Sequence, residues 1–158
     1  MKMSAQTITE VFTKVVDYVS KLEDVQIQNV DSDEHTLYFT KGSVWGSITL
    51  TTYPEVEEVI LVLIRIPVVI NPRNLDEGVL RDLLHRNLEN IYGGFGISRE
   101  DNSVWLCYTL LGNTLDIDQL NIALITMSVF ADTIDEELCA LTGGERGSDF
   151  LRRLQSEE

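Results

Sequence analysis

The chain has 158 residues, of which 44% are hydrophobic and 24% are charged, so it is long and apolar enough to bury one core as a single domain. Its formal net charge of −14 repels phosphate backbones and anionic lipid surfaces, which disfavours nucleic-acid and membrane partners. A basic protein partner is compatible with this charge, and so is a purely solubilising role.

Cysteine usage and the absence of a leader pattern indicate the compartment. Cys107 and Cys139 lack the spacing of a disulfide scaffold and are interpreted as small core residues in a reducing environment. The first four residues carry no apolar signal sequence. The longest apolar run, residues 59–70, contains Arg65 and Pro67 and is too short to cross a bilayer. We therefore expect a cytoplasmic protein.

The N-terminal third changes from a helical to a strand pattern. Apolar residues in segment 6–22 recur at the spacing of one helix face. Thr7 and Glu10 match a capping box at the start of this helix. Residues 25–70 then alternate between polar and apolar side chains, which predicts strands.

Two alternating runs, residues 36–40 and 44–50, predict a β-hairpin. A two-residue loop at positions 41–42 would join them. In that register Tyr38 lies opposite Trp45 on the outer face of the hairpin. Aromatic side chains on a face otherwise made of threonine and serine are either covered by another element or available to a partner. We therefore take Tyr38 and Trp45 as candidate partner-binding residues.

The next strand is predicted at residues 59–66, after a turn that contains Tyr53, which is the third candidate partner-binding residue. This strand is apolar at nearly every position, so we expect it to be buried on both faces at the centre of the sheet. Pro67 is expected to end it.

The second half contains two helices and a pair of strands. A helix is predicted to begin at Asn74, with Glu77 as its capping partner, and Gly93 is placed as its left-handed cap. Strands are predicted at residues 95–98 and 104–111, separated by an acidic turn.

The third helix is predicted over residues 117–141, with Asp116 as its N-cap and a glycine pair at 143–144 as its stop. It carries more apolar surface than one core face needs. We expect the sheet to cover one side and another helix or a second subunit to cover the other. Residues 143–158 form a polar C-terminal tail, either mobile or folded as a short docked helix.

Motifs for chemistry are absent from the sequence pattern. The glycine cluster at residues 93–96 closes a helix and opens a strand, which is the reverse of a phosphate loop. His35 and His85 have no partner at metal-ligand spacing. We expect no cofactor, no metal and no catalytic site, although an enzyme built from dispersed carboxylates remains a third hypothesis for function.

The order helix, three strands, helix, two strands, helix resembles the class I type III secretion chaperones, the Tir-chaperone or CesT-like family, and the related YbjN-like proteins. Three segments carry the resemblance most strongly: Leu-Leu-His-Arg-Asn-Leu at 83–88, Gly-Gly-Phe-Gly-Ile at 93–97 and Val-Trp-Leu-Cys-Tyr-Thr-Leu at 104–110. It implies an α+β domain over residues 1–142, in the order α-β-β-β-α-β-β-α, with an antiparallel sheet of about five strands flanked by helices.

The resemblance also implies a function. Members of this family are homodimers without enzymatic activity that bind an extended segment of a client protein. Their dimer contacts would fall on Leu84, Leu88 and Ile91 of the second helix and on Trp105 and Tyr108 of the following strands, although the leucines could instead be core. The alternative is a regulatory or scaffold dimer of YbjN-like type that binds a folded partner.

Overall fold

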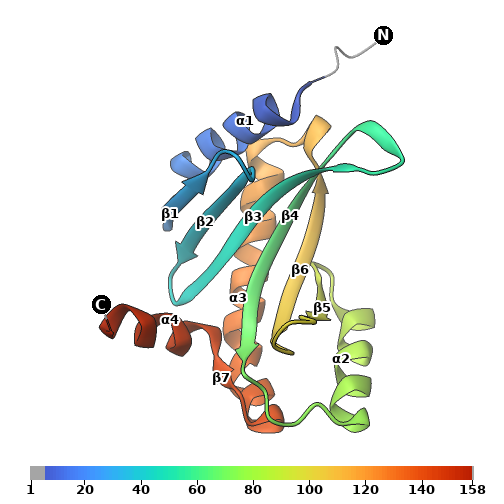
Figure 1. Ribbon diagram of the computed structural model, residues 1–158, viewed down its shortest axis with the longest axis vertical. Coiled ribbons are helices and arrows are strands. Elements are labelled where there is room, and N and C mark those ends of the chain that lie inside the picture. Colours follow the sequence, from blue (N-terminus) through green and yellow to red (C-terminus); the bar gives the residue numbers. More distant parts are fainter. Residues whose placement is uncertain (1–5, 158) are drawn as a thin grey trace.

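The computed structural model describes residues 6–157. The expectation that the first four residues carry no signal sequence lies outside these described residues. Within it, the chain forms one antiparallel sheet with helices packed around it (Figure 1). The elements in chain order are α1 (Ile8–Lys21), β1 (Val25–Asp31), β2 (Thr36–Lys41), β3 (Val44–Tyr53), β4 (Val56–Ile70), α2 (Glu77–Glu89), β5 (Gly94–Ile97), β6 (Val104–Leu111), a 3₁₀ turn η1 (Gly112–Thr114), α3 (Ile117–Thr142), β7 (Glu145–Arg146) and α4 (Gly147–Ser156).

The predicted α+β class is confirmed, but the sheet has more strands than expected. Its order is β1-β2-β3-β4-β6-β5, and the short β7 pairs with β4. Four strands rather than three precede α2, because β1 forms a ladder of its own with β2. Figure 1 shows α3 running along the sheet behind β3 and β4, with α1 at one end and α2 beside β5.

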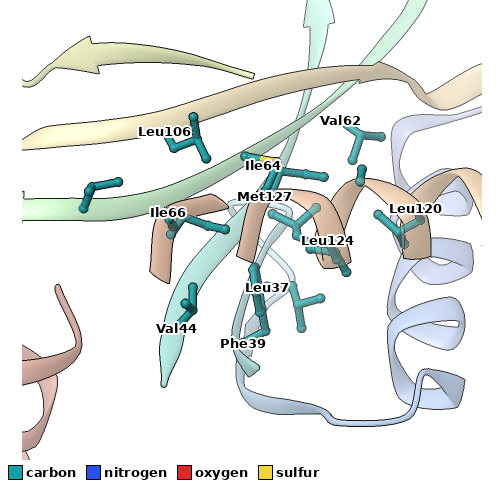
Figure 2. Close-up of a cluster of buried hydrophobic side chains, with 14 of the residues drawn as sticks. Leu37, Phe39, Val44, Val62, Ile64, Ile66, Leu106, Leu120, Leu124 and Met127 are labelled. Carbon is teal, nitrogen blue, oxygen red and sulfur yellow. The ribbon is translucent and has the colours of Figure 1, made fainter. Parts of the chain in front are cut away.

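The core lies between the sheet and the layer formed by α1 and α3. Figure 2 shows core-facing strand residues against one side of α3, and its fully buried side chains include Leu37, Phe39, Val62, Ile64, Ile66, Leu106, Leu120, Leu124 and Met127. Burial of each such aliphatic or aromatic side chain contributes roughly 1.5–3 kcal/mol. Since side chains alternate along a strand, this packing fixes which residues point to the opposite face.

The predicted caps of α1 and α3 are confirmed. Thr7 and Glu10 form a reciprocal capping box at the start of α1. Asp116 and Gln119 do the same at the start of α3. Gly143, with φ of 69°, is the left-handed C-cap that ends α3.

The predicted register of the β2–β3 hairpin is wrong by two residues. Lys41 pairs with Val44, so Tyr38 faces Ser47 and Thr40 faces Trp45. The loop is therefore at positions 42–43, and Gly42 has φ of +58°, which suits the first position of a type II′ turn. A shift of two positions preserves the faces, so Tyr38 and Trp45 remain on one face as diagonal neighbours.

Strand β4 lies at the sheet centre as predicted, between β3 and β6, but two other expectations for it are wrong. Pro67 does not end the strand, which continues to Ile70. The proline stands at a register shift in the ladder with β6, where its missing N–H is tolerated. Nor is the strand buried on both faces, since Leu63 is half-buried and Arg65 is exposed.

The predicted bounds of α2 also need correction. Asn74 accepts a hydrogen bond from the N–H of Asp76, and this turn precedes the helix. Asp76 is the N-cap, and its carboxylate accepts from the N–H of Val79 at 3.0 Å. The helix ends before Gly93, which instead lies in the turn into β5, where an added Cβ would stand 2.9 Å from the carbonyl oxygen of Cys107.

The segment after α3 folds back onto the sheet. β7 pairs with the end of β4, and α4 packs against β3 and β4. Arg146 binds Asp149 and Glu136 at the base of α4. Phe150 and Leu151 are half-buried on this helix.

Helix α3 is long and apolar enough to cross a bilayer by length and composition alone. One side of it nevertheless packs as a core helix, because Leu120, Leu124 and Met127 are fully buried against the sheet. Its second apolar strip, Ile125 and Val129 among others, is exposed. The expected cover on that side is therefore not supplied by the described part of the chain.

Candidate partner-binding surfaces

The face of the sheet opposite α1 and α3 is the first candidate surface, and we call it the open sheet face. Strand alternation directs every second residue of β2, β3, β4 and β6 toward it. Of the helices in residues 6–157, α4 packs on this side, at one end, where the indole N–H of Trp45 donates to the carbonyl of Gly147. The open sheet face comprises Tyr38, Trp45, Ser47, Thr49, Leu61, Leu63, Arg65, Trp105, Cys107 and Thr109.

The three predicted partner-binding residues occupy different environments on this face. Tyr38 is 42% exposed and has no covering element in the described part of the chain. Trp45 is half-buried, with its N–H 2.7 Å from the Gly147 oxygen. Tyr53 is 44% exposed at the far end of β3, roughly 25 Å from Trp45 at the rise of an extended strand. The structure therefore brings Tyr38 and Trp45 together and leaves Tyr53 apart.

Trp105 lies beside Trp45 on the open sheet face. The two indole rings meet edge to face with centroids 6.0 Å apart. The N–H of Trp105 donates to the hydroxyl of Ser103 at 3.2 Å. Asp101 in turn accepts hydrogen bonds from both the N–H and the hydroxyl of Ser103, which lower the pKa of Asp101. These contacts hold the Trp105 ring and the β5–β6 turn in place.

A groove of about 480 Å³ lies next to this tryptophan pair. It runs across β2, β3, β4 and β6 to the edge strand β5, and it is lined by Tyr38, Ser47, Arg65, Gly96, Ile97, Ser98, Glu100, Trp105 and Cys107. Burial raises the pKa of the Cys107 thiol, and the charge of Arg65 opposes that shift. The groove therefore has a neutral thiol beside one exposed guanidinium.

The second candidate surface consists of Leu84 and Leu88 on the outer side of α2 and of Ile91, which follows the end of the helix, and we call it the α2 apolar face. Leu84 is 68% exposed, and Leu88 and Ile91 are each 87% exposed. Val79 and Leu83 are the buried residues of this helix. The alternative that the three predicted interface residues belong to the core is therefore wrong. Neighbouring exposed aliphatic side chains of this kind are typical of interaction surfaces.

The two remaining predicted interface residues project from opposite faces of β6. Trp105 belongs to the open sheet face, as described above. Tyr108 lies on the helix side of the sheet and packs on Tyr92, with ring centroids 5.3 Å apart. Tyr92 closely follows α2, so Tyr108 lies near the C-terminal end of the α2 apolar face.

Sequence reasoning missed Arg65, Leu61 and Leu63 as surface residues. Their signal was an apolar strand with one arginine in its middle, which we interpreted as doubly buried. A strand whose second apolar face is exposed for a partner has the same sequence pattern as a strand that is buried on both faces within the fold.

The described residues 6–157 contain no group of three histidine, cysteine, aspartate or glutamate side chains placed to hold a metal ion. His35 forms a hydrogen bond with the hydroxyl of Thr9 and packs edge to face on Phe12. Asp135, whose pKa is raised by burial, lies on α3 near Arg146. None of these contacts assembles a nucleophile with a base.

Comparison with known proteins identifies the class. The family model CesT_Tir_1 matches residues 8–142. The chain therefore belongs to the CesT_Tir_1 family, and the resemblance to the class I type III secretion chaperones is confirmed. The match ends before β7 and α4.

Two solved structures have a similar fold. A chain in the crystal structure of the ExsC–ExsE complex matches with a TM-score of 0.56 and 17% identity, covering 83% of this chain and 92% of that chain. A chain in the HopA1–SchA chaperone–effector complex matches with a TM-score of 0.59 and 15% identity, covering 83% of this chain and 98% of that chain. No curated protein sequence matches this chain.

Proposed function

We propose that this protein is a non-enzymatic, dimeric chaperone that holds an extended segment of a client protein on its open sheet face. The observation that carries the proposal is the apolar and aromatic surface there, where Tyr38, Leu63 and Trp105 lie among threonine and serine. Membership of the CesT_Tir_1 family supports it. So does the fold shared with a chaperone–effector complex.

The chemistry of this face suits an unfolded segment. An extended peptide presents alternate side chains to one surface, and scattered apolar contacts separated by hydroxyl groups can take them without requiring a folded partner. The client loses conformational entropy when it becomes ordered on the protein, which lowers the affinity obtained from a given contact area. The net charge of −14 disfavours nucleic acid and anionic membranes as competing partners.

The α2 apolar face supports the dimer. A two-fold axis would place Leu84, Leu88 and Ile91 of one copy against the same residues of the other, because such an interface is self-complementary. Leu84 and Leu88 lie on the opposite side of α2 from its buried residues Val79 and Leu83, and Ile91 follows the end of the helix. Dimerisation there would leave the Tyr38 region of the open sheet face accessible.

The alternative function is a regulatory or scaffold dimer of YbjN-like type that binds a folded partner. Affinity capture from the native host, followed by mass spectrometry and hydrogen exchange of the captured protein, separates the two. We expect one protein to co-purify. Its bound segment should have no folded structure of its own and should be protected from hydrogen exchange only where it contacts this chain. A captured partner that is folded throughout would favour the scaffold.

The variant for this experiment is Tyr38→Glu, which places a carboxylate on the exposed part of the open sheet face. Its matched control is Val129→Glu, since Val129 is also exposed but lies on α3, in the helix layer. The partner should be lost with Tyr38→Glu and retained with Val129→Glu. Loss with neither variant would move the binding site away from this face.

A further inference from the structure

We propose that Arg65 recognises a carboxylate of the bound client segment, so that the open sheet face selects segments with an aspartate or glutamate between apolar residues. The inference rests on the proposed function and names the chemistry of the partner. Three observations carry it: the position of Arg65 in the sheet, the lack of an ion pair to its guanidinium in the described part of the chain, and the apolar residues around it.

Arg65 occupies the middle of the open sheet face. Its backbone pairs with Ser47 of β3 on one side and with Cys107 of β6 on the other. Tyr38 of β2 is the next residue in the same row across the sheet, because it pairs with Ser47. Arg65 is exposed and lines the floor of the 480 Å³ groove. A cation therefore stands at the centre of the surface where a client segment would lie.

The charge of Arg65 is not neutralised within the described part of the chain. Ion pairs engage five other arginines, which all lie in the helices or in β7: Arg81, Arg86, Arg146, Arg152 and Arg153. Among the side chains that the structure describes, no carboxylate forms an ion pair with Arg65, although Glu100 lines the same groove. In a protein with 26 acidic and 12 basic residues, an arginine left unpaired on a binding face is available to an external anion.

The surroundings of Arg65 favour a carboxylate on a peptide. The guanidinium presents its donors in a planar fork that matches a carboxylate, and such charge-assisted hydrogen bonds are stronger than neutral ones. Leu63 lies two residues from Arg65 on β4, and Trp105 is a diagonal neighbour on β6 in the opposite direction, since it pairs with Pro67. A segment that crosses Arg65 from Leu63 on β4 toward Trp105 on β6 would place an acidic side chain over Arg65 and apolar side chains on either side of it.

The test uses the full chain as bait for a displayed library of random short peptides. Selected peptides should be enriched in aspartate or glutamate flanked at alternate positions by apolar residues. The best peptide, made synthetically, should bind Arg65→Gln about tenfold more weakly than the natural chain. The same peptide with its acid replaced by the amide should lose a similar factor on the natural chain and little more on Arg65→Gln, which assigns the loss to this pair.

Arg73→Gln is the matched control, because Arg73 is exposed, unpaired in the described part of the chain and located in the loop between β4 and α2. It removes the same charge and should leave peptide affinity unchanged. If peptides bind but show no acidic preference, or bind Arg65→Gln equally well, the inference is wrong while the proposed function stands. If Arg65→Gln alters only the oligomeric state, Arg65 is a contact between copies and the inference is also wrong. If no peptide binds the natural chain, the proposed function itself fails.

Discussion

Two asparagines each complete the hydrogen bonding of a strand with one side chain. Asn113 donates from Nδ2 to the carbonyl of Glu58 and accepts at Oδ1 from the N–H of Ile60, both at 2.8 Å. Asn87 accepts at Oδ1 from the N–H of Phe95 and donates from Nδ2 to the carbonyl of the same residue, at 2.6 and 3.2 Å. Each side-chain amide supplies the hydrogen bonds that a neighbouring strand would otherwise make. Asn113 does so for β4 beyond the end of β6, and Asn87 does so for the edge strand β5.

Replacing Asn113 by alanine is therefore expected to destabilise the fold. Two hydrogen bonds are lost, and the N–H of the buried Ile60 is left without a partner, which should lower the free energy of unfolding by about 2 kcal/mol. Urea denaturation followed by circular dichroism measures this change. Asn29→Ala on the exposed part of β1 is the control and should change stability by less than about 0.5 kcal/mol. Equal effects of the two substitutions would contradict the role given to Asn113.

At the scale of single elements, α3 carries a carboxyl group on its buried side. Asp135 is 7% exposed, and its Oδ1 atom has no hydrogen-bond partner in the described part of the chain. Burial raises the pKa of Asp135 above its ordinary value of 3.8, Arg146 opposes the shift, and Asp132 and Glu136 add to it. The same neighbourhood raises the pKa of the Cys139 thiol to about 11, mainly by burial.

This environment predicts how stability depends on pH. Because the folded-state pKa of Asp135 lies above the unfolded value of 3.8, the folded state binds the proton more tightly between these two values. The contribution of this group to the free energy of unfolding therefore falls as pH rises through that window, and the penalty persists at neutral pH. Asp135→Asn should raise stability at neutral pH and have less effect below pH 3.8.

Urea denaturation at a series of pH values checks this prediction. Glu23→Gln is the control, because it removes the same charge from an exposed position after α1 and reports the general effect of a lower net charge. A neutral-pH gain in Asp135→Asn no larger than that in Glu23→Gln would show that burial of the carboxylate carries no penalty.

The elements that sequence reasoning predicted well are those with local signals. The capping boxes at Thr7 and Asp116 fix the starts of α1 and α3, and Gly143 fixes the end of α3, because each depends on residues within a few positions. The prediction that Pro67 ends its strand was wrong because a register shift accommodates the proline. That shift depends on pairing with β6, which the local sequence does not show. Docking of α4 depends on the contact of Gly147 with Trp45, about a hundred positions away in sequence.

The candidate surfaces were less predictable for a related reason. Leu84, Leu88 and Ile91 follow a helical spacing that is the same whether a core or a second molecule covers them. Arg65 and Leu63 alternate with buried residues in a strand that looks doubly buried in sequence. Only the position of α1 and α3 on one side of the sheet shows that the other side is open.

At the scale of the whole molecule, the exposed side chains of α2 predict the oligomeric state. Leu88 is 87% exposed at the centre of the α2 apolar face. A two-fold interface there would bury the Leu88 side chains of both copies. Leu88→Glu would place a carboxylate from each copy in that interface, and burying an unpaired carboxylate is costly. We expect the natural chain to have twice the 17.9 kDa mass of one chain by light scattering, and Leu88→Glu to have the mass of one chain.

The matched control is Tyr38→Glu, which adds the same charge on the open sheet face and should remain dimeric. Circular dichroism must show that both variants keep the fold, which is expected because both side chains are exposed. Dissociation by Tyr38→Glu and not by Leu88→Glu would move the dimer contact to the open sheet face, and the client could then not lie across Arg65. If only Leu88→Glu dissociates the dimer, the two surfaces are independent, and a monomer that still binds peptide would show that one copy holds a complete client site.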